Sequence, residues 1–395
     1  MQGASRITVV AGGLLVAAAW AIGAFDLLGE HRAITDILAE VVAVLVIILA
    51  WRYRRDRLAI AALVIAAANL LARTGHVTSA NEATGTVLAL VISFDLCLLA
   101  LTRDRPLWRP TWMIWLAVVA SQMWFAAFGI HLADGPIVNY LGNPHLPMAA
   151  LVSAGVITVV TFMIRRTPFE GSLVWVVVAV TAALVNWRGS QPATLFFAAG
   201  QLALLVGLFE DSYRLAFHDE LTGLPGRRAL DEAMQGLSGA FTIAMVDIDH
   251  FKRFNDRHGH DAGDQVLRMI ADELAKTGGG GRAYRYGGEE FTILFSGKSM
   301  PDLRGDLETV RSSIADRTFA LRAPDRPATK PDKPKKKTRP PTRVTVTISI
   351  GTASSNSRRP SPASVLKAAD RALYRAKRAG RNRVVAAGDR LPKRS

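Results

Sequence analysis

The sequence predicts a bundle of membrane-spanning helices followed by an α/β domain, and two observations carry this prediction. Residues 1–209 of the 395-residue chain contain no lysine and read as repeated apolar blocks. Residues 210–395 mix charged and apolar residues with helix and strand periodicities, as soluble α/β domains do. The boundary between the halves is therefore predicted near residues 209–218.

The apolar blocks are long enough to cross a membrane. A spanning helix needs about 20 mostly apolar residues, because the hydrocarbon core is about 30 Å thick and each residue rises about 1.5 Å. Eight blocks are predicted as spans, at residues 7–29, 33–51, 57–72, 83–101, 111–132, 146–164, 171–187 and 192–209. The third block is the shortest.

The arginines between the blocks predict the side of the membrane on which each loop lies. With the N-terminus inside, the inner loops hold ten arginines and the outer loops hold three. The inner set is Arg6, Arg52, Arg54, Arg55, Arg57, Arg103, Arg105, Arg109, Arg165 and Arg166, and the outer set is Arg32, Arg73 and Arg188. Because basic residues concentrate on the cytoplasmic side, eight spans predict a cytoplasmic N-terminus and a cytoplasmic C-terminal half.

The role of the ionisable residues in the first half stays open. Glu40 and Asp95 lie within apolar blocks, where such side chains are costly and often functional. His131, Asp134 and His145 fall near the predicted outer face, where they either bind a ligand or merely flank a loop. Sensing or anchoring is therefore the predicted role of this half.

The second half delivers carboxylates at the end of a predicted strand. Residues 241–246 form a short apolar run that ends in Asp247 and Asp249. Strand alternation points these two side chains to one face, and ligand sites in α/β sheets favour such strand ends. Lys252 follows within reach of a phosphate, and a helix is predicted from about residue 261 to 276. Taken alone, Asp247 would be interpreted as a helix N-cap or turn residue in preference to a ligand.

A second acidic cluster favours a ligand-binding role for Asp247 over a turn or N-cap role. The stretch “RAYRYGGEEFTILF”, residues 282–295, sets Glu289 and Glu290 beside two glycines between two predicted strands. A Gly-Gly hairpin turn, in which both residues adopt positive φ, explains the glycines but not the glutamates. Two carboxylate sites at strand ends suit Mg²⁺ bound to a triphosphate. The sequence has no GxxxxGK[ST] loop, so a P-loop nucleotidase is disfavoured.

Five motifs then occur in order: “DELTGLPGRR”, “DIDHFKRFNDRHGHDAGD”, “RYGGEEF”, “TVTISIG” and “ADRALYRAKRAGRNRV”. With these motifs, residues 215–388 resemble the GGDEF domain of bacterial diguanylate cyclases, in the GGEEF variant. The resemblance implies a palm-like α/β fold with a mixed sheet, as in class III nucleotide cyclases. It also implies that the domain condenses two GTP molecules into cyclic di-GMP with release of pyrophosphate.

The resemblance further implies roles for single residues, with Asp247, Glu289 and Glu290 as the catalytic group. Mg²⁺ or Mn²⁺ would be held by Asp247, the Ile248 carbonyl, Glu289 and Glu290. The guanine edge would be bound by Asn255 and Asp264. The phosphates would be bound by Lys252, Lys377, Arg381, the Phe251 backbone, Gly287 and Gly288. Because each domain holds one GTP, catalysis is expected to need a homodimer, joined through the membrane half and a short coupling helix.

Two departures from the family pattern have consequences. Many members carry an Arg-x-x-Asp product-inhibition site, and here Gly278 and Gly281 occupy its positions. Product inhibition through that site is therefore not expected. The segment at residues 322–343 holds nine Lys/Arg, two Asp and six prolines, which predicts a disordered insert.

The insert is predicted to be a solvated spacer, with contact to anionic lipid headgroups as the alternative. Liposome binding by a chain that lacks residues 322–343 would distinguish the two roles. Nucleic-acid binding is not expected, because the run contains no aromatic residues between its charges.

The predicted protein is a multi-pass diguanylate cyclase of the bacterial inner membrane. Its predicted parts are a transmembrane domain at 1–209, a coupling helix at 210–218, a GGDEF domain at 219–388 and a tail at 389–395. The alternatives are a catalytically silent GGDEF domain that binds GTP or docks a partner, a cyclase that makes a mixed guanine-adenine dinucleotide, and a transporter with a regulatory domain.

Overall fold

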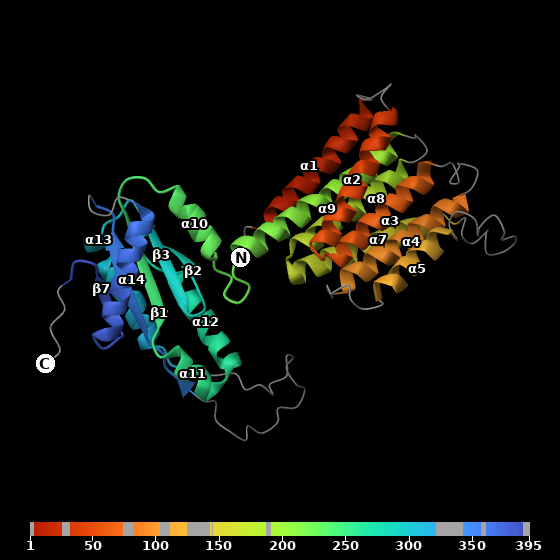
Figure 1. The fold of residues 1–395 in the computed structure, drawn as a ribbon. Coiled ribbons are helices and arrows are strands. Elements are labelled where there is room, and N and C mark those ends of the chain that lie inside the picture. The colour runs from red at the N-terminus through yellow and green to blue at the C-terminus, as the bar shows by residue number, and fades with distance from the viewer. Residues whose placement is uncertain are drawn as a thin grey trace, which may run out of the picture. The chain divides into compact units, whose positions relative to one another are not determined.

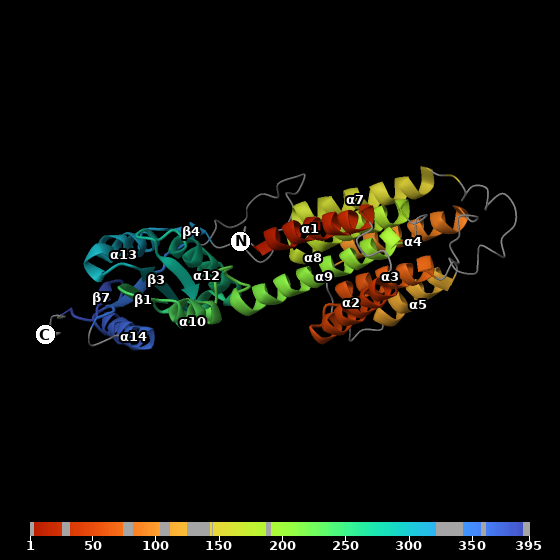
Figure 2. The same cartoon turned by 90° about the horizontal axis from the view of Figure 1, so that it is seen from above.

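A computed structural model of the chain describes residues 4–25, 32–73, 82–102, 111–124, 143, 145–186, 191–320, 343–356 and 361–389. The chain divides into two compact units, Met1–Arg214 and Leu215–Ser395. The described part of the first unit is helical, and the second contains the sheets (Figure 1, Figure 2). Of the predicted features, His131, Asp134 and residues 322–342 lie outside the described ranges.

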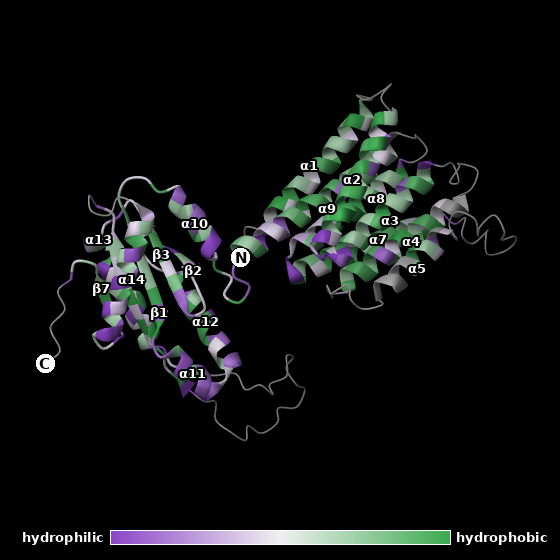
Figure 3. Cartoon of the chain, viewed as in Figure 1, coloured by the Kyte–Doolittle hydropathy of each residue, from purple (hydrophilic) through white to green (hydrophobic). Residues whose placement is uncertain are grey.

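The first unit is built from long apolar helices. Its described helices are α1 (Ala4–Ala24), α2 (Arg32–Arg52), α3 (Asp56–Arg73), α4 (Glu82–Leu101), α5 (Thr111–Trp124), α7 (His145–Arg165), α8 (Pro168–Val185) and α9 (Gln191–Phe217). Five of the helices described, namely α1, α2, α7, α8 and α9, are long and apolar enough to cross a membrane, and α4 contains a shorter apolar segment. Hydrophobic colours run along most of their length in Figure 3, as expected where lipid and neighbouring helices replace water.

Charged side chains at one end of this bundle are paired. Arg57 Nη1 and Arg165 Nη1 each lie 3.1 Å from Glu170 Oε1. Arg57 Nε also donates a hydrogen bond to the Leu99 carbonyl at 2.9 Å. Because an unpaired buried charge is costly, these contacts let α3 and α8 carry charged residues in the bundle.

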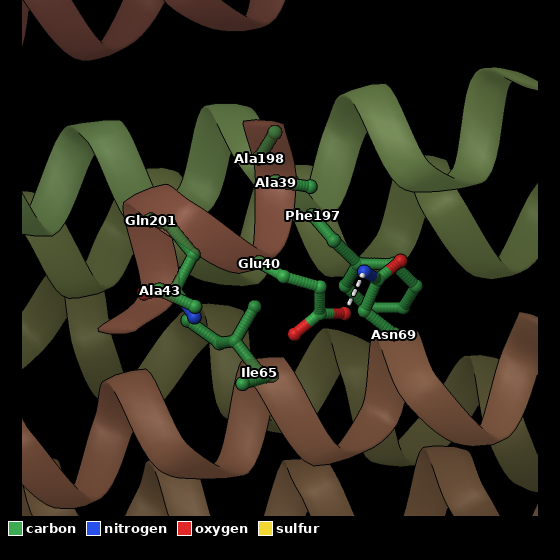
Figure 4. Close-up of a pocket in the computed structure, with 9 residues that line it drawn as sticks. Ala39, Glu40, Ala43, Ile65, Asn69, Phe197, Ala198 and Gln201 are labelled. Carbon is green, nitrogen blue, oxygen red and sulfur yellow. Dashed lines mark hydrogen bonds between the residues drawn. The ribbon is translucent and has the colours of Figure 1, made fainter. Parts of the chain in front are cut away.

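Glu40 and Asp95 also have polar partners. Asn69 Nδ2 donates to Glu40 Oε1 at 3.2 Å, and Arg73 Nη1 lies 3.4 Å from the same oxygen. Figure 4 shows Glu40 and Asn69 at a small pocket between α2, α3 and α9, lined by Ala39, Glu40, Ala43, Ile65, Ala66, Asn69, Phe197, Ala198 and Gln201. With its amide nitrogen turned toward Asp95, Gln122 donates to both carboxylate oxygens, at 3.2 and 3.0 Å. Both carboxylates thus have a structural role as partners within the bundle.

The second unit is a five-stranded sheet with helices on both faces. The strand order is β2-β3-β1-β6-β7, in which the β6–β7 pair is parallel and the other pairs are antiparallel. Its elements are α10 (Arg227–Gln235), β1 (Phe241–Ile248), α11 (Phe251–His258), α12 (His260–Leu274), β2 (Arg282–Arg285), β3 (Glu290–Ser296), α13 (Met300–Ala315), β6 (Ile348–Ser354), α14 (Pro362–Arg378) and β7 (Val384–Ala386).

The two faces of the sheet have separate cores. Val246 and Ile248 of β1 belong to the core under α11, α12 and α13. Ile243 and Met245 belong to the core under α10 and α14. Since alternate strand residues point to opposite faces, Asp247 lies on the α14 face.

Two short strands flank the predicted insert. Strand β4 (Phe319–Ala320) pairs antiparallel with β5 (Arg343–Val344). Arg343 is therefore a strand residue, so the predicted extent of the insert is wrong at its last position. The pairing needs an antiparallel partner from the other end of the insert, which composition alone cannot indicate.

Candidate active site at the end of strand β1

Asp247 is held at the C-terminal end of β1 between two neighbouring strands. The strand register places Glu290 of β3 opposite Asp247 on one side and Ser349 of β6 opposite it on the other side. The residue is 3% exposed, and Lys377 Nζ of α14 lies 2.8 Å from Asp247 Oδ2. A buried carboxylate requires such a partner, so Lys377 offsets the charge of Asp247.

The connection between β2 and β3 carries Gly287, Gly288 and Glu289. Neither glycine has a positive φ, so the β2–β3 hairpin does not use the two-residue turn that needs positive φ at both residues. Strand β2 ends at Arg285 and β3 begins at Glu290, which leaves four residues, 286–289, in the connection. A loop of this length closes without the left-handed conformations that a two-residue hairpin needs. Gly288 has no atom within 4 Å of the position of a Cβ, so the glycine leaves its surface open.

Arg285 clamps this loop. Its guanidinium donates to the Gly287 carbonyl at 3.2 Å, to the Gly288 carbonyl at 2.7 Å and to Asp219 Oδ1 at 2.7 Å. Burial raises the pKa of Asp219, but hydrogen bonds from Thr222 and Arg285 outweigh it and leave that pKa below its usual range. Sequence reasoning missed Arg285 and Asp219, although both lie inside the quoted motifs, because only the fold brings them together.

Four acidic residues interact electrostatically here, namely Asp247, Asp249, Glu289 and Glu290. Burial raises the pKa of Asp247, and the charges of Glu290 and Asp249 raise it further, while Lys377 lowers it. Burial also raises the pKa of Glu289, assisted by the charge of Asp247. Such a group of carboxylates with one ammonium partner has the donor chemistry of a site for a hard divalent cation.

The donor set fits Mg²⁺ bound together with a nucleotide. Among the residues described, no three His, Cys, Asp or Glu side chains converge into a complete metal cage. Mg²⁺ does not need one, because it usually takes one or two carboxylates and fills its other positions with phosphate oxygens and water. Asp247 and Glu289 can supply such carboxylates.

Asn255 and the residue before Asp264 approach each other across α11 and α12. A Cβ on Gly263 would lie only 2.0 Å from Asn255 Oδ1, so the backbone of α12 closely approaches this side chain. Among the described atoms, the buried Asn255 Oδ1 has no hydrogen-bond partner. A buried acceptor without a partner is costly, so this oxygen is an unsatisfied polar atom beside the backbone of α12. Asp264 is half-buried on α12, next to Gly263.

The side chains predicted to contact phosphate lie at the start of α11, in the last turn of α14 and in the turn that follows α14. Phe251, 6% exposed, begins α11, and Lys252 is exposed beside it. Lys377 is in the last turn of α14, and Arg381 follows that helix with a φ of 64°. The structure therefore brings Lys377 into direct contact with Asp247.

Residues 216–383 match the family model described as “Diguanylate cyclase, GGDEF domain”. These residues form a GGDEF domain. The chain is 38% identical over 183 residues to diguanylate cyclase DgcP of Pseudomonas aeruginosa, covering 44% of this chain and 24% of the relative. It is 34% identical over 187 residues to response regulator PleD of Caulobacter vibrioides, covering 45% of this chain and 37% of that protein.

The similarity to the probable diguanylate cyclase DgcC of Escherichia coli extends beyond the GGDEF domain. The identity is 27% over 304 residues, covering 70% of this chain and 74% of the relative. A solved GGDEF domain of DgcB from Caulobacter crescentus, in complex with c-di-GMP, is 35% identical and covers 44% of this chain and 97% of its own, with a TM-score of 0.37. The chain spans a quarter to about half of the length of the first curated relatives that it matches.

In this GGDEF domain, the positions expected for a product-inhibition site lie beside Asp306 and Phe295. A Cβ on Gly278 would lie 2.4 Å from Asp306 Oδ1, and a Cβ on Gly281 would lie 2.6 Å from the Phe295 ring. Asp306 would also repel the phosphates of a dinucleotide. These contacts support the expectation that no such site operates here.

The raised carboxylate pKa values predict an acid-sensitive GGDEF domain. If Asp247 and Glu289 bind a metal-nucleotide complex in their ionised forms, as the resemblance implies, kcat/KM for GTP should fall on the acid side at a higher pH than unperturbed carboxylates, with pKa values of about 4, would give. Lys377→Gln removes the ammonium that lowers the pKa of Asp247, so this acid limb should move to higher pH. Lys276→Gln, at a lysine paired with Glu273, is the control. A limb that stays in place or moves to lower pH in Lys377→Gln would contradict the assignment.

Proposed function

We propose that the chain is a membrane-bound diguanylate cyclase that condenses two GTP molecules into cyclic di-GMP and pyrophosphate. The single observation that carries the proposal is the cluster at the end of β1, where Asp247 lies opposite Glu290 on the adjacent strand β3 and pairs with Lys377. This cluster lies within the residues that match the GGDEF family. The relative DgcP, named a diguanylate cyclase, supports the same activity.

In the proposed reaction, the 3′-hydroxyl oxygen of one GTP forms a bond to the α-phosphorus of the other. The bond from that phosphorus to the β-phosphate oxygen breaks, and pyrophosphate leaves with its electron pair. A second such transfer in the opposite direction closes the ring. Mg²⁺ or Mn²⁺, when bound, would favour loss of the hydroxyl proton and neutralise phosphoryl charge.

The residues of this chain would orient the reactants. Asp247, the Ile248 carbonyl and Glu289 would hold the metal, with Glu290 as a further carboxylate that binds metal or takes the proton. Lys377 already lies 2.8 Å from Asp247 and would exchange this contact for a phosphate when the metal binds. The open surface at Gly288 supports a close approach of the α-phosphate to the backbone. Lys252, Arg381 and the Phe251 backbone would contact the remaining phosphates.

Guanine recognition would fall to Asn255 and Asp264. The Asn255 amide presents an acceptor without a partner among the described atoms, and a carboxylate can accept two hydrogen bonds from the guanine edge. This pair favours cyclic di-GMP over a mixed guanine-adenine product. Since each domain would hold one GTP, the active form would be a homodimer with two facing sites.

The membrane half would cross the bacterial inner membrane eight times, with both the N-terminus and the GGDEF domain in the cytoplasm. Each of the eight predicted blocks overlaps a described helix. The charges of α3, at Asp56, Arg57 and Arg73, lie at its two ends, and Arg57 is ion-paired. A short helix with terminal, paired charges is compatible with a span.

Cysteine labelling tests this topology. In a Cys97→Ser background, which removes the native cysteine, a membrane-impermeant maleimide on spheroplasts with intact inner membranes should label Asn143→Cys but not Tyr53→Cys. Permeabilised cells, in which both must react, are the control. Protection of Asn143→Cys in spheroplasts would mean that α3 does not span and that the later loops change sides.

Product analysis tests the catalytic proposal. Full-length protein in nanodiscs should convert GTP and Mg²⁺ into cyclic di-GMP by mass spectrometry, and an equimolar GTP and ATP mixture should give the same main product. A mixed dinucleotide as the main product would overturn the substrate assignment. GTP binding by a verified dimer that forms no dinucleotide would instead favour a silent binding module.

A further inference from the structure

Asp249 resembles Asp247 in sequence but has a different environment. Both lie on the same face at the end of β1, and Asp249 is 7% exposed. Thr347 Oγ1 donates to Asp249 Oδ2 at 2.7 Å, and Ser349 Oγ donates to Oδ1 at 2.7 Å. Both carboxylate oxygens of Asp249 therefore accept hydrogen bonds from strand β6 or from the residue that precedes it, whereas Asp247 pairs with a lysine.

The third donor to Asp249 comes from the turn after α14. The backbone N–H of Asn382 donates to Asp249 Oδ2 at 3.0 Å. Three consecutive residues of this turn have positive φ: Gly380 at 117°, Arg381 at 64° and Asn382 at 45°. Left-handed backbone at two non-glycine residues is unfavourable, so this turn persists only where surrounding contacts stabilise it.

Other contacts also stabilise the turn, among them a partly buried hydrogen bond that Arg383 Nε donates to the Arg381 carbonyl at 2.9 Å. Arg381 N–H donates to the Ala376 carbonyl at 3.1 Å, and Arg311 Nη1 of α13 donates to Asn382 Oδ1 at 2.5 Å. The Arg311 contact is exposed and therefore weak. The Asp249 bond is partly buried and joins a carboxylate to the backbone, which makes it the stronger restraint.

We propose that Asp249 is a positioning residue, which fixes the turn at residues 380–382 and thereby holds Arg381 in the arrangement that the triphosphate requires. Asp249 acts through the backbone of Asn382 and contacts neither metal nor substrate. The proposal rests on the proposed cyclase function, in which Arg381 contacts phosphate. Removing the carboxylate should let the turn relax toward negative φ and carry Arg381 away from the nucleotide.

A double-mutant cycle tests this route. Asp249→Asn, Arg381→Ala and the double variant are compared in the full-length chain in nanodiscs, with kcat and KM for GTP and the affinity for a non-hydrolysable GTP analogue. Asp249→Asn should lower kcat/KM about ten- to a hundredfold, which is typical for a hydrogen bond to a charged group. In the Arg381→Ala background the same change should cost less than about threefold, because its target is already absent. Asp256→Asn, at an exposed carboxylate on α11, should leave activity unchanged.

Several outcomes would overturn the proposal. Losses that multiply in the double variant would mean that Asp249 acts independently of Arg381. A loss in Asp249→Asn that Mn²⁺ restores would point to metal binding instead. If Asp249→Asn does not fold, Thr347→Val removes only one donor and takes its place in the cycle, where coupling to Arg381→Ala of less than twofold would refute the proposal. If the wild-type chain binds GTP but forms no product, the cyclase function fails, while the affinity cycle still tests the positioning role.

Discussion

Glu289→Gln is expected to reduce cyclic di-GMP formation by about a hundred- to a thousandfold, the loss typical of removing one group that stabilises charge in the transition state. The substitution keeps the size of the side chain and removes the negative charge. Because burial and Asp247 already raise the pKa of Glu289, removing the negative charge of this side chain should not destabilise the fold. The loss should therefore appear in kcat, with little change in the melting temperature.

GTP binding separates this effect from misfolding. Asn255, Asp264 and Lys377 remain in the variant, so a fluorescent GTP analogue should still bind within about tenfold of the wild-type affinity. Glu308→Gln, at an exposed glutamate of α13 that pairs with Arg311, is the matched control and should retain full activity. A Glu289→Gln variant with more than about a tenth of wild-type activity would contradict the role of Glu289 as a metal ligand.

Gly351→Ala is expected to destabilise the GGDEF domain by at least about 3 kcal/mol, at the upper end of overpacking substitutions. A Cβ at this position would lie 1.9 Å from the Leu373 nitrogen and 2.4 Å from the Ala369 carbonyl oxygen. Both are backbone atoms of α14, so no side-chain rotation can relieve the clash. Helix α14 would have to move off β6, taking Lys377 with it.

A second glycine provides the control. Gly305 lies inside α13 with no atom within 4 Å of a Cβ, so Gly305→Ala should stabilise the domain by up to about 1 kcal/mol through helix propensity. Thermal and urea unfolding, followed by a probe within the domain, measure both changes. Equal melting temperatures for the two variants would show that α14 does not pack against β6 as closely as the structure indicates.

The sequence predicted those features that depend on local pattern. The run at 241–246 predicted a buried strand, and β1 is buried along its whole length from Phe241 to Ile248. The spacing of Val266, Leu267, Ile270 and Leu274 predicted the inward face of α12, and all four are buried. Local periodicity suffices in these cases because each element buries one face.

Features that depend on contacts distant in sequence were not predicted. Arg285 binds the carbonyls of Gly287 and Gly288 and is itself held by Asp219, which lies 66 positions away in the sequence. The difference between Asp247 and Asp249 follows from residues about a hundred or more positions away, at Ser349 and Asn382. Strand alternation gave these two carboxylates the same direction, but their partners come from long-range strand pairing.

Helix α9 continues without a break from Gln191 to Phe217, through the last apolar block and into the residues that precede the GGDEF motifs. At about 1.5 Å and 100° per residue, its 27 residues make a rod about 40 Å long. The number of residues in this rod also fixes the angle by which one end is rotated about the helix axis relative to the other end. Removing one residue from such a rod would turn everything that follows by more than a quarter of a circle, whereas removing seven would nearly restore the original direction. The length of this helix thus sets the rotational phase between its first and last residues.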